Sequence, residues 1–300
     1  MRRSGWRWIA AIACLLATIE LAPRATNAAT IGVVVGGEGV NVRSCPSLDC
    51  DVLDVLPLGT TVEIAGDEVD GFVPVRHRST TAYAYRLYVA TNPAEPPYLI
   101  EGQPGCNRVS IIFNVGIGEE SAWGIVDTLV EAEAPATMFV MGWWAEAFPD
   151  ALERLAASGF VIGSHGDQPV ELTRRSDAEV LADIRAASSA IEGVLGVQPG
   201  PWFTPYAAAV DGRVRSLIAR EGYLPVAWRV PAIDYGPDAT AEGVYRQVMG
   251  KVYDGAIVEM HLDGPASATS TAVALPRIIA DLRAQGYQLV DIPDLATPCL

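Results

Sequence analysis

The sequence predicts an α/β protein in which a small all-β domain precedes a larger domain built on a parallel sheet. Residues 30–90 consist of short strand-like runs separated by turns, without a helical period. From residue 106 onward, apolar strands alternate with helical segments. Repeated strand–helix units imply a parallel sheet, which is either open or closed into a barrel.

The small domain is expected to contain short strands that glycine and proline turns separate. We place these strands at residues 31–35, 40–43, 52–56, 61–65, 73–76 and 83–89. The turn signals are Gly-Gly at 36–37, Pro-Leu-Gly at 57–59 and Asp-Gly at 70–71. Residues 91–105, which hold four prolines, then predict a stiff and extended linker to the larger domain.

The larger domain, residues 106–300, is expected to alternate strands and helices to its end. We place strands at residues 109–113, 136–141, 160–163, 225–230, 256–260 and 288–291. We place helices at residues 121–134, 151–157, 176–195, 211–221, 241–249 and 275–284. The clearest helix start is a capping box, in which Ser176 is followed three residues later by Glu179.

Residues 1–28 are typical of a secretory signal peptide. Three arginines lie within the first eight residues, an apolar run occupies 9–22, and small residues surround a cleavage site after Ala28. The apolar run is shorter than the roughly 20 residues that span a bilayer. We therefore expect a secreted, cell-wall-associated protein with no transmembrane segment after cleavage.

The cysteines agree with an exported protein. Besides Cys14, the chain has Cys45, Cys50, Cys106 and Cys299, and an oxidising compartment permits disulfides among them. Four cysteines allow three pairings, of which the local pair Cys45–Cys50 leaves Cys106–Cys299 to join the ends of the larger domain. A metal site is disfavoured, because no second close cysteine or histidine pair accompanies these residues.

Composition and charge exclude several classes of protein. Half of the chain is hydrophobic and 19% is charged, which excludes a disordered chain or a coiled coil. The formal net charge is −15, from 36 acidic and 21 basic side chains. No basic block is present to bind phosphates, so nucleic acid is excluded as a partner. A neutral or cationic partner such as a glycan fits better.

Residues 30–90 resemble the bacterial SH3-like domain. The run GVNVRSCPS at 39–47 and the run LGTTV at 58–62 are similar to the two conserved patterns of that family. The resemblance implies a small β-barrel. Members of this family either bind cell-wall peptides or act as spacers.

Residues 106–300 resemble the polysaccharide deacetylases, whose NodB-homology domain is a distorted (β/α) barrel. The resemblance rests on motifs in the family's order, namely IFNVG at 112–116, ATMFV at 136–140, IGSH at 162–165, WFTPYA at 202–207, Asp-Tyr at 234–235 and IVEMH at 257–261. It implies a polysaccharide or peptidoglycan partner. In active members, a divalent metal polarises the amide of an N-acetyl group and supplies a hydroxide.

The residues that this chemistry needs are largely replaced. The family uses an aspartate and two histidines as metal ligands, and a neighbouring aspartate as base. Here Asn114 stands in the base position, Val115 in the metal-aspartate position and Pro169 in the second-histidine position. His165 is the one retained ligand, and Asp167 is a possible substitute ligand. The arginine of the third motif is also absent.

Other positions of the family site are retained. The resemblance places His261 in the position of the catalytic acid, with Asp234 as a further candidate. Four aromatic side chains are expected to line a substrate groove: Trp202, Tyr206, Trp228 and Tyr235.

Three hypotheses follow. The first is a degenerate homologue that binds glycan and needs no cofactor. The second is an active hydrolase of carbon–nitrogen bonds that removes N-acetyl groups with non-standard ligands and a metal such as zinc. The third is a structural or partner-binding protein that acts through its SH3-like domain. The sequence leaves the oligomeric state open.

Overall fold

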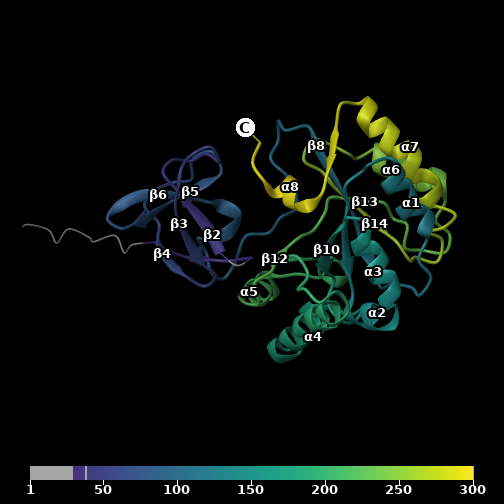
Figure 1. Ribbon diagram of the computed structural model, residues 1–300, viewed down its shortest axis with the longest axis horizontal. Coiled ribbons are helices and arrows are strands. Elements are labelled where there is room, and N and C mark those ends of the chain that lie inside the picture. The colour runs from purple at the N-terminus through teal and green to yellow at the C-terminus, as the bar shows by residue number, and fades with distance from the viewer. Residues whose placement is uncertain (1–29, 38, 300) are drawn as a thin grey trace, which may run out of the picture.

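The computed structural model describes residues 30–37 and 39–299, and the segment expected to be a signal peptide lies outside them. A small all-β part precedes a larger α/β part, as the two ends of Figure 1 show. Since the larger part contains a parallel sheet with helices around it, the expected α/β class is confirmed.

Two antiparallel sheets form the small part, and their order is β4-β1-β7 and β3-β2-β6-β5. The strands are β1 (Ile31–Val34), β2 (Gly39–Arg43), β3 (Val52–Pro57), β4 (Thr61–Glu63), β5 (Phe72–His77), β6 (Thr80–Tyr85) and β7 (Val89–Ala90). A core of mostly valine side chains lies between the sheets. These β-branched residues favour the extended backbone and pack well across a thin barrel.

The single strand expected at residues 83–89 is wrong. Strand β6 ends at Tyr85, a 3-10 turn (Arg86–Tyr88) follows, and β7 then pairs with β1 in the other sheet. The chain changes sheets here, so the backbone has to turn out of the first sheet before it can pair again. The apolar pattern alone does not reveal this turn.

The sheet of the larger part has eight parallel strands, with β12-β11-β10-β9-β8-β14-β13 in order and β15 beside the start of β8. The strands are β8 (Arg108–Val115), β9 (Thr137–Val140), β10 (Val161–Ser164), β11 (Trp202–Phe203), β12 (Leu224–Pro225), β13 (Val230–Pro231), β14 (Ile257–His261) and β15 (Gln288–Val290). Strand β8 lies at the centre and is buried along nearly its whole length. It therefore organises the core of this part.

The helices surround this sheet. They are α1 (Trp123–Glu131), α2 (Gly142–Ala147), α3 (Pro149–Ala157), α4 (Asp177–Leu195), α5 (Gly212–Arg220), α6 (Ala241–Met249), α7 (Thr271–Ala284) and α8 (Ile292–Ala296). The capping box at Ser176 is confirmed, with both of its hydrogen bonds formed. Sequence analysis missed α2 and α8, and α7 begins before Leu275, with Pro276 inside it.

The single strand expected at residues 225–230 is also wrong. Strand β12 pairs with β11 at one edge of the sheet, and β13 pairs with β14 near the other edge. The connection between them crosses the sheet and carries Trp228. Both strands have only two residues, so the continuous apolar run concealed the crossing.

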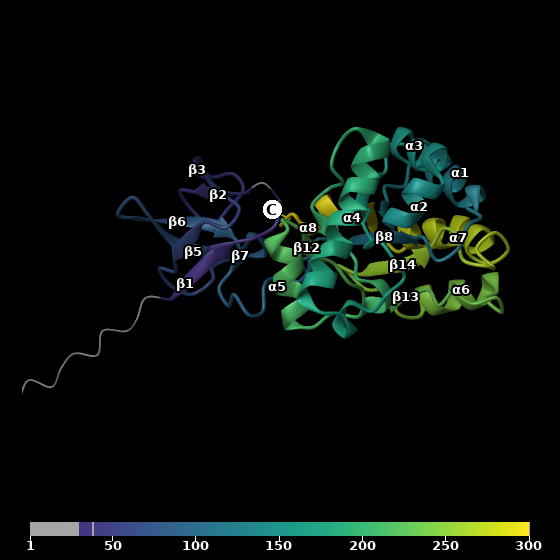
Figure 2. The same ribbon diagram turned by 90° about the horizontal axis from the view of Figure 1, so that it is seen from below.

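The small domain packs directly on the larger one. One buried cluster contains Val35 and Leu87 of the small domain together with Ala219 and Leu224 of the larger domain. In both views, α5, β12 and α8 lie on the side of the larger domain that faces the small domain (Figure 1, Figure 2). The backbone N–H of Gly37 donates to the Gly222 carbonyl at 2.8 Å. The two domains thus share an apolar interface.

Gly36 shows why the contact requires a glycine. Its φ is +70°, in the left-handed region, and a Cβ there would lie 2.3 Å from Leu224 Cγ. A larger residue would be strained in conformation and would also clash with the larger domain.

Both expected disulfides are present. One joins Cys45 to Cys50, and the other joins Cys106, before β8, to Cys299, after α8. None of the helices in the described ranges combines the length and apolarity that crossing a membrane requires.

Candidate functional site

The candidate site is a cavity of about 610 Å³ at the carboxyl ends of the central strands. This is the end at which parallel α/β folds place their binding residues. Its polar lining is Asn114, His165, Glu259 and His261. Its aromatic lining is Tyr206, Trp228 and Tyr235, so three of the four aromatic residues expected in the groove face this cavity.

A buried hydrogen-bond network starts from His165, which directly follows β10. His165 Nδ1 lies 2.8 Å from the Thr204 carbonyl oxygen and 2.8 Å from Thr204 Oγ1. Thr204 Oγ1 donates to Asn114 Oδ1 at 3.0 Å, and Asn114 Nδ2 donates to Glu259 Oε1 at 3.2 Å. Both the oxygen and the nitrogen of the Asn114 amide therefore have a protein partner.

The network continues from Glu259 into a second histidine. His261 Nε2 lies 3.1 Å from Glu259 Oε1, and His261 Nδ1 lies 2.8 Å from Asp234 Oδ1. Asp234 also accepts from the backbone N–H of His261 at 3.0 Å and from Thr271 Oγ1 at 2.6 Å. Asp234 therefore orients His261, the residue that the family resemblance places in the acid position.

Sequence analysis missed Glu259. It stands two residues before His261 on β14, and side chains at i and i+2 of a strand point to the same face. A single glutamate inside an otherwise apolar strand was the available signal. Only the pairing of β14 with β8, in which His261 is opposite Asn114, brings this carboxylate against the amide.

Burial controls the protonation of the two histidines in different ways. Burial lowers the pKa of His165 to about 3, although the hydrogen bond to the Thr204 backbone raises it. His165 is thus neutral, with Nδ1–H donated to Thr204 and Nε2 left as an acceptor. Burial also lowers the pKa of His261, but Asp234 and the charge of Glu259 more than offset this, so the pKa is raised.

The buried carboxyl groups also titrate abnormally. Burial raises the pKa of Glu259 to about 7, against the opposing charge of His261 and with the charge of Asp234 adding to the rise. Burial likewise raises the pKa of Asp263 to about 6, while backbone N–H donors such as that of Gly116 lower it. A carboxyl with a raised pKa that lines a cavity, such as that of Glu259, is typical of functional sites.

Gly116 is needed for that contact. Its N–H donates to Asp263 Oδ2 at 2.7 Å. Its φ is +117°, and a Cβ there would lie 2.6 Å from the Met141 Cβ. A side chain at this position would clash with Met141, which precedes α2, and would also strain the backbone.

The residues do not fit the metal that the family uses. Val115 packs into the hydrophobic core, and Pro169 is exposed outside the cavity lining. Within residues 30–37 and 39–299, no three histidine, cysteine, aspartate or glutamate side chains are grouped so that they could hold a metal ion.

Two expectations about this site are wrong. Asp167 does not line the cavity; its Oδ2 accepts from Gln168 Nε2 at 3.0 Å, and its Oδ1 lies near Gly142 of α2. Trp202 does not line it either, because it is buried with Leu224 in the cluster beneath the small domain.

The rim of the cavity contains strained backbone. Ala207 and Ala208 line the cavity with φ of 55° and 52°, and Ile233 has φ of 57° directly before Asp234. The left-handed region costs an L-residue roughly 1–2 kcal/mol. Such strain often gathers at functional sites, and here it shapes the turns that present Tyr206 and Asp234.

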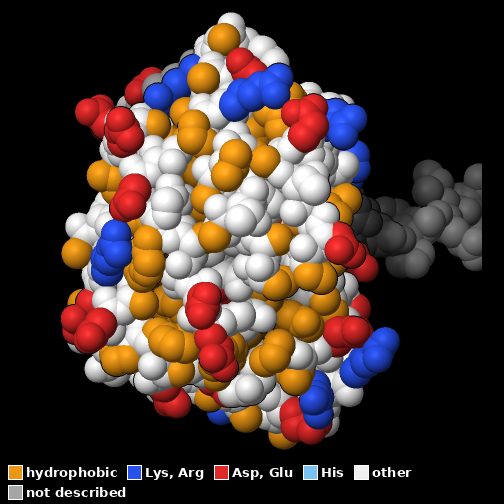
Figure 3. Space-filling view, turned by 90° about the vertical axis from the view of Figure 1, so that its right-hand side faces the viewer, with side chains coloured by type: hydrophobic (Ala, Val, Ile, Leu, Met, Phe, Trp, Pro, Cys, Tyr) orange, Lys and Arg blue, Asp and Glu red, His pale blue; other side chains and the backbone are white. Residues whose placement is uncertain are grey.

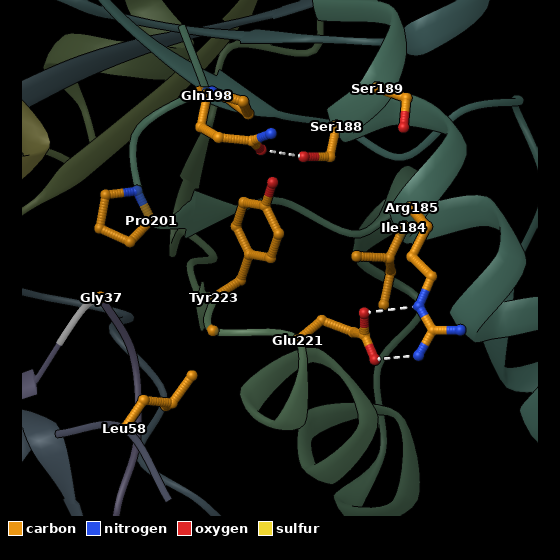
Figure 4. Close-up of a pocket in the computed structure, with 12 residues that line it drawn as sticks. Gly37, Leu58, Ile184, Arg185, Ser188, Ser189, Gln198, Pro201, Glu221 and Tyr223 are labelled. Atoms are coloured by element: carbon orange, nitrogen blue, oxygen red, sulfur yellow. Dashed lines mark hydrogen bonds and ion pairs between the residues drawn. The ribbon is translucent and has the colours of Figure 1, made fainter. Parts of the chain in front are cut away.

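A second cavity, of about 700 Å³, lies between the two domains. Figure 4 shows Gly37 and Leu58 of the small domain facing Tyr223, with an ion pair between Arg185 and Glu221 at 2.7 Å. The polar residues at the family's motif positions, namely Asn114, His165, Asp234 and His261, do not line this cavity. We therefore place the candidate site in the cavity at the strand ends.

The outer face over α1, α6 and α7 carries no basic patch. Acidic and basic side chains are interspersed there among apolar and uncharged ones (Figure 3). This face gives no sign of a surface for polyanions.

The curled parallel sheet and the histidine–aspartate pair at its carboxyl end define a deacetylase-like α/β class. A family model described as polysaccharide deacetylase matches residues 101–226, and one described as bacterial SH3 domain matches residues 38–90. The chain therefore contains a polysaccharide deacetylase domain, and a bacterial SH3 domain precedes it.

The relatives include named enzymes. A peptidoglycan-N-acetylglucosamine deacetylase of Bacillus cereus is 24% identical over 198 residues, which are 66% of this chain and 71% of that protein. One of Listeria monocytogenes is 31% identical over 189 residues, which are 63% of this chain and only 38% of that protein.

A solved structure adds a different kind of relative. The crystal structure of a CE4 family pseudoenzyme from Bacillus anthracis matches with a TM-score of 0.62 and 25% identity. The match covers 69% of this chain and 71% of that chain. The family thus includes both deacetylases and a protein described as a pseudoenzyme.

Proposed function

We propose that the chain binds a glucosamine-based glycan in the strand-end cavity without hydrolysing it. The observation that carries this proposal is the state of the base position. Asn114 has no proton-accepting group at useful pH, and its amide is engaged by Thr204 and Glu259. The cavity, however, is large enough for a sugar unit.

The energetic cost of the replacements supports this proposal. Loss of a general base typically costs about 10²–10⁴ in rate. The missing metal ligands remove several further kcal/mol of transition-state stabilisation. Together these losses leave little catalysis above the uncatalysed rate.

The aromatic lining supports a sugar as the ligand. Tyr206, Trp228 and Tyr235 line the cavity, and aromatic rings offer broad apolar faces on which pyranose rings can stack. The named relatives are peptidoglycan deacetylases, which is consistent with a cell-wall glycan.

Calorimetric titration of the full mature chain tests this proposal. The ligands are tetramers of N-acetylglucosamine and of glucosamine, and acetate release is measured in parallel with added zinc or cobalt. We expect binding of at least one tetramer and no acetate. Absence of heat with both tetramers at millimolar concentration would refute the proposal.

A second candidate is an active hydrolase, and Glu259 is the observation that favours it. Its carboxyl has a pKa of about 7 and lies beside His261, so the two groups could exchange a proton near neutral pH. Metal analysis and acetate release decide between the candidates. Stoichiometric metal, with release that His165→Ala abolishes, would establish the hydrolase.

We also propose export to the cell wall and domain limits of 1–28, 30–90, 91–105 and 106–300. Mass spectrometry of the secreted chain should give an N-terminus at Ala29.

A structural role for the SH3 domain is tested by sedimentation of the full chain with isolated peptidoglycan. If Tyr235→Ala leaves that sedimentation unchanged, recognition lies outside the cavity and the third hypothesis is favoured.

A further inference from the structure

The buried polar side chains of the strand-end cavity offer free hydrogen-bond acceptors. Because the Thr204 carbonyl can only accept, Nδ1 of His165 carries the hydrogen, which leaves Nε2 as the acceptor of the neutral ring. Glu259 Oε1 is already shared by Asn114 and His261, whereas no donor is recorded for Oε2 among the described residues. Glu259 lines the cavity with a side chain that is 4% exposed, so Oε2 is the oxygen left for a ligand.

The donors of the buried polar side chains mostly face protein acceptors. One N–H of the Asn114 amide donates to Glu259, and the imidazole nitrogens of His261 face Asp234 and Glu259, whereas Tyr206, Trp228 and Tyr235 carry further donors on the lining. An acetamido group is neutral and has a single N–H, so it would supply at most one donor to the acceptors of Glu259 and His165. An ammonium group instead brings three donors and needs acceptors.

The buried carboxyl groups of Glu259, Asp234 and Asp263 outnumber the one imidazole with a raised pKa, that of His261. Neither lysine nor arginine is among the lining residues. Arg229, next to Trp228 in the chain, is held by Glu101 at 3.2 Å. Asp234 and Asp263 lie buried behind His261 and Gly116. A formal charge of −15 over the whole chain adds attraction for a cationic polymer.

The aromatic lining fits the same ligand class. Tyr206 lies 6.2 Å from His165 between ring centroids, and Tyr235 lies 6.0 Å from His261 at 78°. The aromatic rings therefore lie beside the two histidines that flank Glu259. Faces of aromatic rings attract ammonium groups as well as sugar rings.

We propose that this cavity selects the free-amino sugar, with the ammonium group of a glucosaminyl residue bound by Glu259 and His165 between aromatic walls. This inference rests on the proposed function and specifies its ligand. The chain would thus recognise glycan from which the N-acetyl group has already been removed, and a deacetylation reaction must supply that ligand.

Titration calorimetry with tetramers of glucosamine and N-acetylglucosamine tests this inference at neutral pH. The wild-type chain should bind the glucosamine tetramer at least tenfold more tightly. Equal affinity, or tighter binding of the acetylated tetramer, overturns the inference and leaves the proposed function standing. Failure of both tetramers to bind overturns both.

Two variants locate the ammonium site. Glu259→Gln keeps the shape of the side chain and should weaken binding of the glucosamine tetramer roughly tenfold to a hundredfold, the value of a charged hydrogen bond. Glu146→Gln removes the same charge from an exposed position on α2 and should change nothing. Equal effects of the two variants overturn the inference.

A third variant covers the case in which Glu259→Gln fails to fold. Tyr235 is 59% exposed, so Tyr235→Ala leaves the core intact and should weaken binding of the glucosamine tetramer. Unchanged binding would place the ligand elsewhere and overturn the inference. 1,5-Diaminopentane, an amine without a sugar ring, should bind at least tenfold more weakly than the tetramer; equal affinity would assign the cavity to amines in general and also overturn it.

Discussion

Replacement of Asn114 by aspartate restores the residue type of the family's base, and we expect it to destabilise this protein in a pH-dependent way. The Asn114 amide donates to Glu259 Oε1 at 3.2 Å. The new carboxylate would meet Glu259 without that donor, and two buried carboxylates at this distance cannot both ionise. The pair must therefore hold a proton.

The magnitude follows from the proton that Glu259 binds. Its pKa is about 7, so at pH 6 the pair shares a proton at little cost. Each pH unit above about 7 adds about 1.4 kcal/mol to the cost of keeping that proton. Asn114→Asp should therefore lower the free energy of unfolding by about 3 kcal/mol more at pH 9 than at pH 6–7.

Urea unfolding of the wild type and the variants at pH 6 to pH 9 measures this difference. The double variant Asn114→Asp/Glu259→Gln exchanges the two partners, so the new amide donates to the new carboxylate and most of the pH dependence should disappear. Asn41→Asp on an exposed strand position is the control. A loss that is the same at pH 6 and pH 9, or that the second replacement does not relieve, would refute the reasoning.

Three further predictions concern stability. The pKa of Glu259 is raised from 4.5 to about 7, so its contribution to the free energy of unfolding is fully present below about pH 4.5 and is lost as the pH rises through 7. Glu259→Gln should therefore gain up to about 3 kcal/mol in the free energy of unfolding relative to the wild type between pH 4.5 and pH 9. Urea unfolding measures this difference, and a difference that stays constant with pH would contradict the prediction. Replacing both Cys106 and Cys299 by serine opens a separation of 193 residues and should cost about 2–5 kcal/mol in thermal unfolding, whereas an unchanged melting temperature would show that the bridge contributes little. Ser176→Ala removes the side chain that caps α4 and reaches Glu179, and should cost about 1 kcal/mol; full stability of this variant would mean that water replaces the cap.

Glu259 illustrates why the sequence alone did not reveal the whole candidate site. Glu259 lies in an otherwise apolar strand, and a single glutamate in such a strand does not indicate which groups its carboxyl contacts. Its role depends on Asn114, which is 145 residues away in the chain. Parallel pairing of β14 with β8 creates this contact, and pairing is a property of the whole sheet.

Trp202 and Asp167 show that a residue expected at the site from its motif can lie elsewhere in the structure. Both stand in motifs that the family resemblance placed at the site, yet Trp202 packs under the small domain and Asp167 lies beside α2. A motif fixes which residue is present, whereas the direction of its side chain depends on the elements packed against it.

Local patterns were sufficient for much of the rest. The alternation of strands and helices, the cap at Ser176 and the two domain types are properties of short windows, in which backbone propensity and periodicity act directly. The residue types Asn114, Val115 and Pro169 are likewise read directly from the sequence, and the family resemblance supplies the positions that they occupy. Tertiary structure decided the state of the site, because burial and remote hydrogen-bond partners set both the protonation of His165 and Glu259 and which of their acceptor atoms lack a partner.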